Sequence, residues 1–198
     1  MKYLVFGSNG MAGHMIAQYL IEKGHEVTGF ARTDSILAHE KEINESKVLE
    51  TLNLTEKNYI VLSSHREENI DNEENFMSLM NAVNTMAQTY QMPIIYSMHP
   101  RSAKFIEDRG FQFHELVRKM PPFNFTDYSA LMKHAYCVVS DSGTMPEESA
   151  ISHFPAVCIR TSTERPESLD KGCYIIGGIK GDSLLQSVDM AVALVCIH

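Results

Sequence analysis

The chain has 198 residues, of which 44% are hydrophobic, and a formal net charge of −8. This length suits one core, or one domain with an appendage, and so acidic a chain lacks the basic face that binds a nucleic-acid backbone. No run of about 18 apolar residues occurs, and the four cysteines form no CxxC pair. We therefore expect no membrane span, no metal site and reduced thiols in a cytoplasmic protein.

The N-terminal segment has the pattern of a βαβ unit. Residues 3–6 are an apolar strand candidate, and a glycine-rich turn follows at 7–13. Apolar residues at steps of three and four over 15–21 predict a helix that Gly24 ends. Residues 25–30 predict a second strand, which completes the first unit of a dinucleotide-binding fold.

The glycines of this turn, Gly7, Gly10 and Gly13, would let the backbone approach a pyrophosphate at a helix N-terminus. With Arg32, which suits a 2′-phosphate, they form a weak candidate NAD(P) site. Residues 1–32 resemble the opening of dTDP-4-dehydrorhamnose-reductase-type enzymes. Beyond this unit, Tyr128 and Lys133 are one residue too far apart for that family's catalytic Tyr-x-x-x-Lys pair. We therefore expect a structural βαβ remnant.

The next segment, residues 33–57, changes in character and predicts a helical linker. It is rich in Glu, Lys, Leu and Ile, and its strongest helical piece is 46–52. Asn53 is placed to end that helix. We expect one or two helices here.

Strands and helices then alternate through residues 58–198. The predicted strands are 59–63, 94–97, 136–139, 156–159 and 174–176, and the predicted helices are 73–90, 102–109, 128–135, 146–153 and 183–194. Such alternation predicts an α/β fold, a doubly wound and mostly parallel Rossmann-like sheet. We expect the N-terminal βαβ to add its strands to the edge of this sheet, and a bare edge to favour a homodimer.

Polar loops leave several of the predicted strands, where ligands bind in open α/β sheets. His65 and Arg66 follow the first strand and could meet a phosphate, or they could belong to a solvated turn. His99 leaves the next strand and could line the same crevice.

A second polar loop precedes a helix. Ser142, Gly143 and Thr144 could present N–H groups and hydroxyls to an anion, and Glu148 could accept hydrogen bonds from a ribose. An ordinary helix N-cap is the alternative. The loop that contains Arg165 suits an anion or a sugar, or it is merely solvated.

In combination these loops resemble a known family. SSHREEN, SMHP, SDSGT followed by EES, and RTSTERPE occur in this order in the non-hydrolysing UDP-N-acetylglucosamine 2-epimerases. The resemblance runs from about Ser35 to Leu194 and is closest to the branch that makes N-acetyl-fucosamine nucleotides. It implies one half of a GT-B fold, the UDP-binding half.

The resemblance also implies roles for individual residues. His65 corresponds to the histidine near the diphosphate, which is a candidate catalytic residue, and Tyr128 to the aromatic residue beside the uracil. Ser142 and Gly143 correspond to the phosphate-binding turn. Glu148 corresponds to the ribose ligand, and Arg165 to the arginine that reaches the pyrophosphate or the sugar.

The implied chemistry is C2 epimerisation of a UDP-N-acetyl-amino sugar without a cofactor: UDP leaves by anti elimination, a glycal forms, and UDP adds back. The family's acid/base carboxylates lie in its first domain, for which the sequence shows no counterpart. We therefore expect weak or no turnover by this chain alone. Two alternatives stay open, a non-catalytic UDP-binding half-domain and, from residues 1–32 only, an NAD(P)-dependent sugar-nucleotide reductase.

Overall fold

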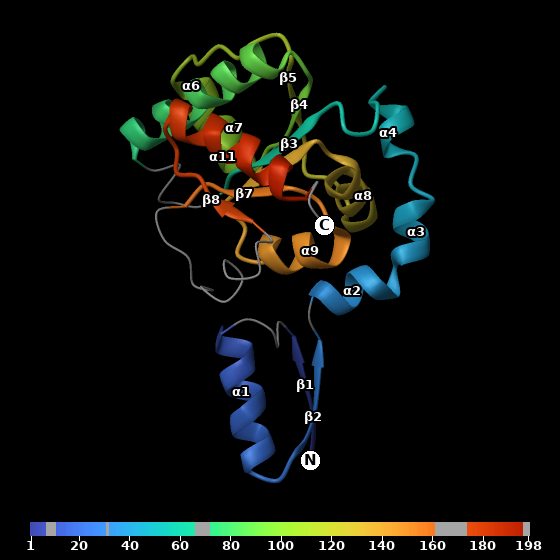
Figure 1. Ribbon diagram of the computed structural model, residues 1–198. Helices are drawn as coiled ribbons and strands as arrows, with labels where there is room; N and C mark the ends of the chain where they lie inside the picture. Colours follow the sequence, from blue (N-terminus) through green and yellow to red (C-terminus); the bar gives the residue numbers. More distant parts are fainter. Residues whose placement is uncertain (7–10, 31, 66–71, 161–173, 196–198) are drawn as a thin grey trace. The chain divides into compact units, whose positions relative to one another are not determined.

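The computed structural model describes residues 1–6, 11–30, 32–65, 72–160 and 174–195 (Figure 1). The chain divides into two compact units, Met1–Asn44 and Glu45–His198. None of the described helices is both long enough and apolar enough to cross a membrane.

The first unit contains the predicted βαβ. Strand β1 (Lys2–Phe6) and strand β2 (Glu26–Phe30) pair in parallel on either side of helix α1 (Met11–Glu22) in the sequence. After the helix, Gly24 adopts a φ of +77°, a conformation that glycine reaches without strain, as expected of a residue that ends a helix.

The expectation that this βαβ extends the larger sheet is wrong. The described strands β1 and β2 form a two-stranded sheet of their own. The ends of the larger sheet are poor templates for another strand. One end is β8 (Ile175–Ile176), which has two residues, and the other is β5 (Val117–Met120), which carries Arg118 and Lys119.

The predicted helical segment contains three described helices rather than one or two. They are α2 (Arg32–Ala38), α3 (Glu40–Asn44) and α4 (Val48–Thr51). Helix α4 ends at Thr51 with Leu52 as its C-cap, and Asn53, the predicted stop, is the next residue, with a φ of 50°.

The second unit is built on a six-stranded sheet in which every pair of neighbouring strands is parallel. Its order is β5-β4-β3-β6-β7-β8. The strands not yet given are β3 (Ile60–Ser63), β4 (Ile94–Ser97), β6 (Cys137–Ser140) and β7 (Ala156–Cys158). The predicted doubly wound, parallel α/β fold is therefore confirmed.

Helices cover both faces of this sheet (Figure 1). They are α6 (Glu73–Tyr90), α7 (Pro100–Asp108), α8 (Phe125–His134), α9 (Met145–Ser152) and α11 (Gly181–Val195). Leu79 of α6 and Leu184 of α11 join Ile60, Leu62 and Val139 in one buried cluster. Alternate strand residues therefore face the α6 and α11 layer, as the two-residue period of a strand requires.

Strand β5 is the one described strand of the larger sheet that the sequence pattern did not predict. Its residues are Val-Arg-Lys-Met, and only Val117 is buried. A strand at the end of a sheet has one open edge, where charged side chains discourage pairing with other chains. Because of this composition, β5 lacks the apolar run by which the other strands were predicted.

Candidate functional site

The larger sheet reverses its winding direction between β3 and β6. From β3 the chain proceeds outward to β4 and β5, and from β6 it proceeds the other way to β7 and β8. Ser63 and Ser140, the last residues of β3 and β6, lie opposite each other in the register. The residues that follow these two strands therefore meet at the topological switch point, where open α/β sheets bind ligands.

His65 and Asp141 are in direct contact at this point. The His65 main-chain N–H donates to both carboxylate oxygens of Asp141, at 3.0 and 3.2 Å. The His65 Nδ1 atom lies 3.0 Å from Asp141 Oδ1. The imidazole is 48% exposed, whereas the Asp141 side chain is completely buried. One buried carboxylate therefore holds both the backbone and the ring of an accessible histidine.

Two buried serines hold this carboxylate in place, Ser64 directly and Ser102 through the Ser64 carbonyl. The buried Ser64 hydroxyl donates to Asp141 Oδ2 at 3.1 Å, and the buried Ser102 hydroxyl of α7 donates to the Ser64 carbonyl at 3.0 Å. Burial raises the pKa of Tyr96 to about 12, and the charge of Asp141 adds to this shift. Hydrogen bonds from several elements thus compensate for the removal of the carboxylate from water.

The turn between β6 and α9 is ordered by its own hydroxyl groups. Ser142 N–H donates to Ser140 Oγ at 3.1 Å, and the Ser142 and Thr144 hydroxyl oxygens lie 3.1 Å apart. The Thr144 hydroxyl donates to Glu148, a buried residue one turn into α9. Gly143, like Ser142 and Thr144, is partly exposed. The Ser142 and Thr144 N–H groups thus donate within the turn, and the turn places two hydroxyl groups and Gly143 at a helix N-terminus, which carries partial positive charge.

His99 and Tyr128 lie at or near the N-termini of the helices that follow β4 and β5. His99 is the exposed N-cap of α7, and its Nδ1 accepts the Arg101 N–H at 3.2 Å. Tyr128 is partly buried near the start of α8. Because helices that follow parallel strands begin at the carboxyl edge of the sheet, both residues lie on the same edge as His65.

The remaining predicted residues have little or no described geometry. Arg66, Arg165, Gly7 and Gly10 lie outside the described residues. Gly13 is in the first turn of α1, and Arg32 is the first residue of α2. The structure therefore describes no cradle for the weak NAD(P) candidate.

Asp141 is a residue of the candidate site that sequence reasoning missed. It lies in the SDSGT segment, but only its neighbours were assigned a role. One feature could have identified it, because this acidic residue directly follows β6, a strand whose four residues are all buried. A carboxylate in such a place needs donors from elsewhere in the fold, because an unpaired buried charge is costly.

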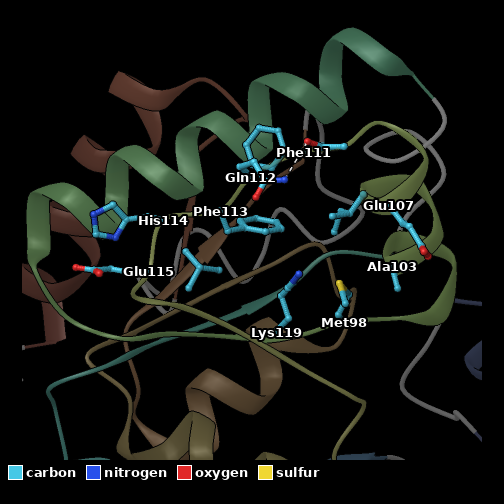
Figure 2. A pocket seen from close by; sticks show the side chains of 12 residues that line it. Met98, Ala103, Glu107, Phe111, Gln112, Phe113, His114, Glu115 and Lys119 are labelled. Atoms are coloured by element: carbon cyan, nitrogen blue, oxygen red, sulfur yellow. Dashed lines mark hydrogen bonds between the residues drawn. The ribbon is translucent and has the colours of Figure 1, made fainter.

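A separate cavity of about 680 Å³ lies beside the edge strand β5 (Figure 2). Its lining includes Met98, Ile106, Phe111, Phe113 and Lys119, and it contains none of the predicted site residues that the structure describes. Besides Lys119, the lining contains the polar residues Glu107, Gln112, His114 and Glu115, but all of these lie outside the polar loops that the sequence singled out as candidate sites. We therefore place the candidate site at the switch point.

Comparisons with known proteins agree with this fold and these motifs. The family model of UDP-N-acetylglucosamine 2-epimerase matches residues 11–194. The UDP-N-acetylglucosamine 2-epimerase of Methanococcus maripaludis is 29% identical over 196 residues, which is 95% of this chain and 53% of the relative. The family model begins at residue 11, earlier than the resemblance from about Ser35. It therefore includes helix α1 and strand β2, which is most of the N-terminal βαβ.

Solved structures give the same result. The UDP-N-acetylglucosamine 2-epimerase of Rickettsia bellii has a TM-score of 0.76 and 29% identity, over 97% of this chain and 58% of that one. The enzyme of Methanocaldococcus jannaschii in complex with UDP-GlcNAc and UDP has a TM-score of 0.75 and 25% identity, over 90% and 52%. The chain spans about half the length of these relatives, and it belongs to the UDP-N-acetylglucosamine 2-epimerase family.

Proposed function

We propose that this chain binds UDP, or the UDP moiety of a UDP-N-acetyl-amino sugar, in the crevice at the carboxyl ends of β3 and β6. The observation that carries this proposal is the convergence of His65, Asp141 and the turn at Ser142 on the switch point. A related structure, that of the Methanocaldococcus jannaschii enzyme, contains UDP-GlcNAc and UDP. The chemistry of the described groups suits a diphosphate, because an imidazole, hydroxyls and main-chain N–H groups can all donate to phosphate oxygens.

In this proposal each part of UDP meets a different element. The diphosphate lies between His65 and the turn formed by Ser142, Gly143 and Thr144, where the N-terminus of α9 favours negative charge. Glu148 at the base of the turn is directed toward the ribose. The uracil lies beside Tyr128 at the start of α8. Additional donors to the anion come from Arg66, His99 and Arg165.

For the sugar reaction we propose binding with weak or no turnover. Epimerisation by elimination and re-addition of UDP needs acid/base groups on both faces of C2 and support for the departing UDP. Asp141 is buried and accepts hydrogen bonds from the Ser64 hydroxyl and the His65 main-chain N–H, and Glu148 is buried and accepts one from the Thr144 hydroxyl. In this proposal the groups at the switch point support the departing UDP, whereas neither of these buried carboxylates is placed to exchange protons with a sugar. The proposed chemistry needs no added cofactor.

Thermal unfolding with added nucleotides tests the proposal. A ligand that binds only the folded chain stabilises it by about 2.7 kcal/mol at a hundredfold excess over Kd, which corresponds to a Tm increase of about 5–10 °C for a chain of this size. We expect this increase with UDP, a smaller one with UMP, which lacks the second phosphate, and none with NADPH. If UDP leaves Tm unchanged, the proposal is wrong.

The fate of the sugar is a separate measurement. UDP-N-acetylglucosamine is incubated with the chain and followed by NMR, and we expect no signal of the C2 epimer. Formation of the epimer would refute the proposed lack of turnover while supporting the binding site. Stabilisation by NADPH alone would favour the reductase alternative. The homodimer and the cytoplasmic location stay predictions from the sequence.

A further inference from the structure

We propose that Asp141 is a positioning residue that orients the His65 imidazole so that Nε2, and not Nδ1, faces the ligand crevice. The inference deepens the proposed function and rests on it, since the crevice is the proposed UDP site. The sequence motif of the phosphate-binding turn contains Asp141 but suggests no role for it.

The contact geometry restrains the histidine at two points. Asp141 accepts the His65 main-chain N–H at 3.0 and 3.2 Å and approaches the ring nitrogen Nδ1 at 3.0 Å. A side chain held at its backbone and at its ring by the same group loses most of its rotational freedom. In an imidazole Nε2 lies across the ring from Nδ1, so with Nδ1 against Asp141 it is directed away from the carboxylate, on a side chain that is 48% exposed.

The charge of Asp141 decides which nitrogen carries the proton. An ionised carboxylate can only accept hydrogen bonds, so the Nδ1 atom next to it must be protonated. In a neutral imidazole Nε2 is then an acceptor, and in a protonated imidazole it is a donor. In both states Nδ1 is occupied by Asp141, and Nε2 is the nitrogen that can meet a phosphate oxygen or a proton of the substrate.

The carboxylate itself is held by more than one element. The Asp141 N–H donates to the Ser63 carbonyl at the end of β3, and the Ser64 hydroxyl donates to Asp141 Oδ2. Ser102 of α7 in turn holds the Ser64 carbonyl. The positioning of His65 thus depends on β3, β6 and α7 together. Hydrogen bonds to the group that contacts a functional histidine help to fix the orientation of its ring.

The substitution Asp141→Asn tests the inference, because an asparagine side chain has one acceptor oxygen and a donor NH₂ group. It cannot accept from Ser64 and from both donors of His65 in the same geometry. The readout is the tautomer of His65, followed by two-bond ¹H–¹⁵N correlation spectra at a pH above the ordinary histidine range. The signals of His65 are identified by their loss in His65→Gln. We expect the Nδ1–H tautomer in the unmodified chain and a shift toward Nε2–H in the variant.

Binding provides the second readout. We expect Asp141→Asn to bind UDP about 10- to 100-fold more weakly, the loss that corresponds to a charge-assisted hydrogen bond. Asp108→Asn, which removes an exposed aspartate of α7, is the matched control and should leave both the tautomer and the affinity unchanged.

The outcomes separate this inference from the proposed function. An Nε2–H tautomer in the unmodified chain overturns the inference even if Asp141→Asn does not fold. An altered tautomer in Asp141→Asn with unchanged UDP affinity also overturns it. If the unmodified chain does not bind UDP, the proposed function fails, while the tautomer comparison still decides whether Asp141 orients His65.

Discussion

The Thr144 hydroxyl donates a hydrogen bond of 2.8 Å to the carboxylate of Glu148, which is almost completely buried. This bond joins the turn after β6 to the body of α9. The same Thr144 oxygen lies 3.1 Å from the Ser142 hydroxyl, so the stability of the fold and the shape of the proposed phosphate turn depend on one side chain.

Thr144→Val therefore should weaken both stability and binding. Valine has nearly the same shape but no hydroxyl, and it leaves the buried Glu148 carboxylate without this donor. We expect a loss of about 1–3 kcal/mol in the free energy of unfolding, measured with urea, and weaker UDP binding by calorimetry. Thr85→Val is the control, because the exposed Thr85 hydroxyl only donates to the Asn81 carbonyl within α6. Equal effects of the two substitutions would contradict the role given to Thr144.

Tyr59→Phe should destabilise the core by about 1–2 kcal/mol in urea unfolding. The Tyr59 side chain is fully buried, and its hydroxyl donates to the Leu131 carbonyl at 2.7 Å. Phenylalanine fills the same space but leaves that carbonyl without its donor. Unchanged stability would show that another group satisfies the Leu131 carbonyl.

The same substitution should change the response to alkaline pH. Burial raises the pKa of Tyr59, and the charge of Glu56 raises it further, so the fold favours the neutral phenol. The contribution of this raised pKa to the free energy of unfolding is complete below the ordinary tyrosine pKa of about 10. It is lost as pH rises through the higher pKa of Tyr59 in the folded chain. Urea unfolding across this range should show a shallower decline for Tyr59→Phe. A decline remains, because burial also raises the pKa of Tyr90.

Glu56→Gln should change how the free energy of unfolding depends on pH in the acidic range. The hydrogen bond from His134, whose Nδ1 lies 3.0 Å from Glu56 Oε1, lowers the pKa of Glu56. A lowered pKa stabilises the fold above the ordinary glutamate value of about 4.3, and this contribution is lost as pH falls through the pKa of the folded state.

The difference between Glu56→Gln and the unmodified chain should therefore be present at neutral pH and absent well below pH ~4. Solvent screening of this exposed pair limits it to less than about 1 kcal/mol. Chemical unfolding at both pH values measures it, with Glu115→Gln, an exposed position, as the control. A difference that persists in acid would mean that the effect does not come from ionisation of Glu56.

Gly177→Ala should be destabilising by about 1–3 kcal/mol, because a Cβ atom there has no room. It would lie 2.6 Å from Val157 Cγ1 of β7 and 3.0 Å from Ser187 Cβ of α11. Gly181→Ala is the matched control, since its Cβ would meet its nearest neighbour, Ala82 Cα, at 4.0 Å. We expect Gly181→Ala to stay within about 0.5 kcal/mol of the unmodified chain in urea unfolding. A similar loss in both variants would argue against overpacking.

Local sequence pattern determined most of the second unit. The helix over 73–90 and the strand over 94–97 were predicted with their observed bounds, because apolar residues recur with the helical period in one and are continuous in the other. Family motifs also located His65 and the turn at Ser142 on one edge of the sheet. These features depend on residues close together in the chain.

Tertiary structure decided what depends on residues far apart in the chain. The place of β5 at a sheet edge, and the pairing of β1 and β2 with each other rather than with the larger sheet, follow from hydrogen bonds between strands, which no local period encodes. The contact of His65 with Asp141 joins residues 76 positions apart. The sequence by itself determined which segments carry the polar groups. Only the order of strands in the sheet brought a buried carboxylate beside an exposed imidazole, because that order sets which strand ends are neighbours.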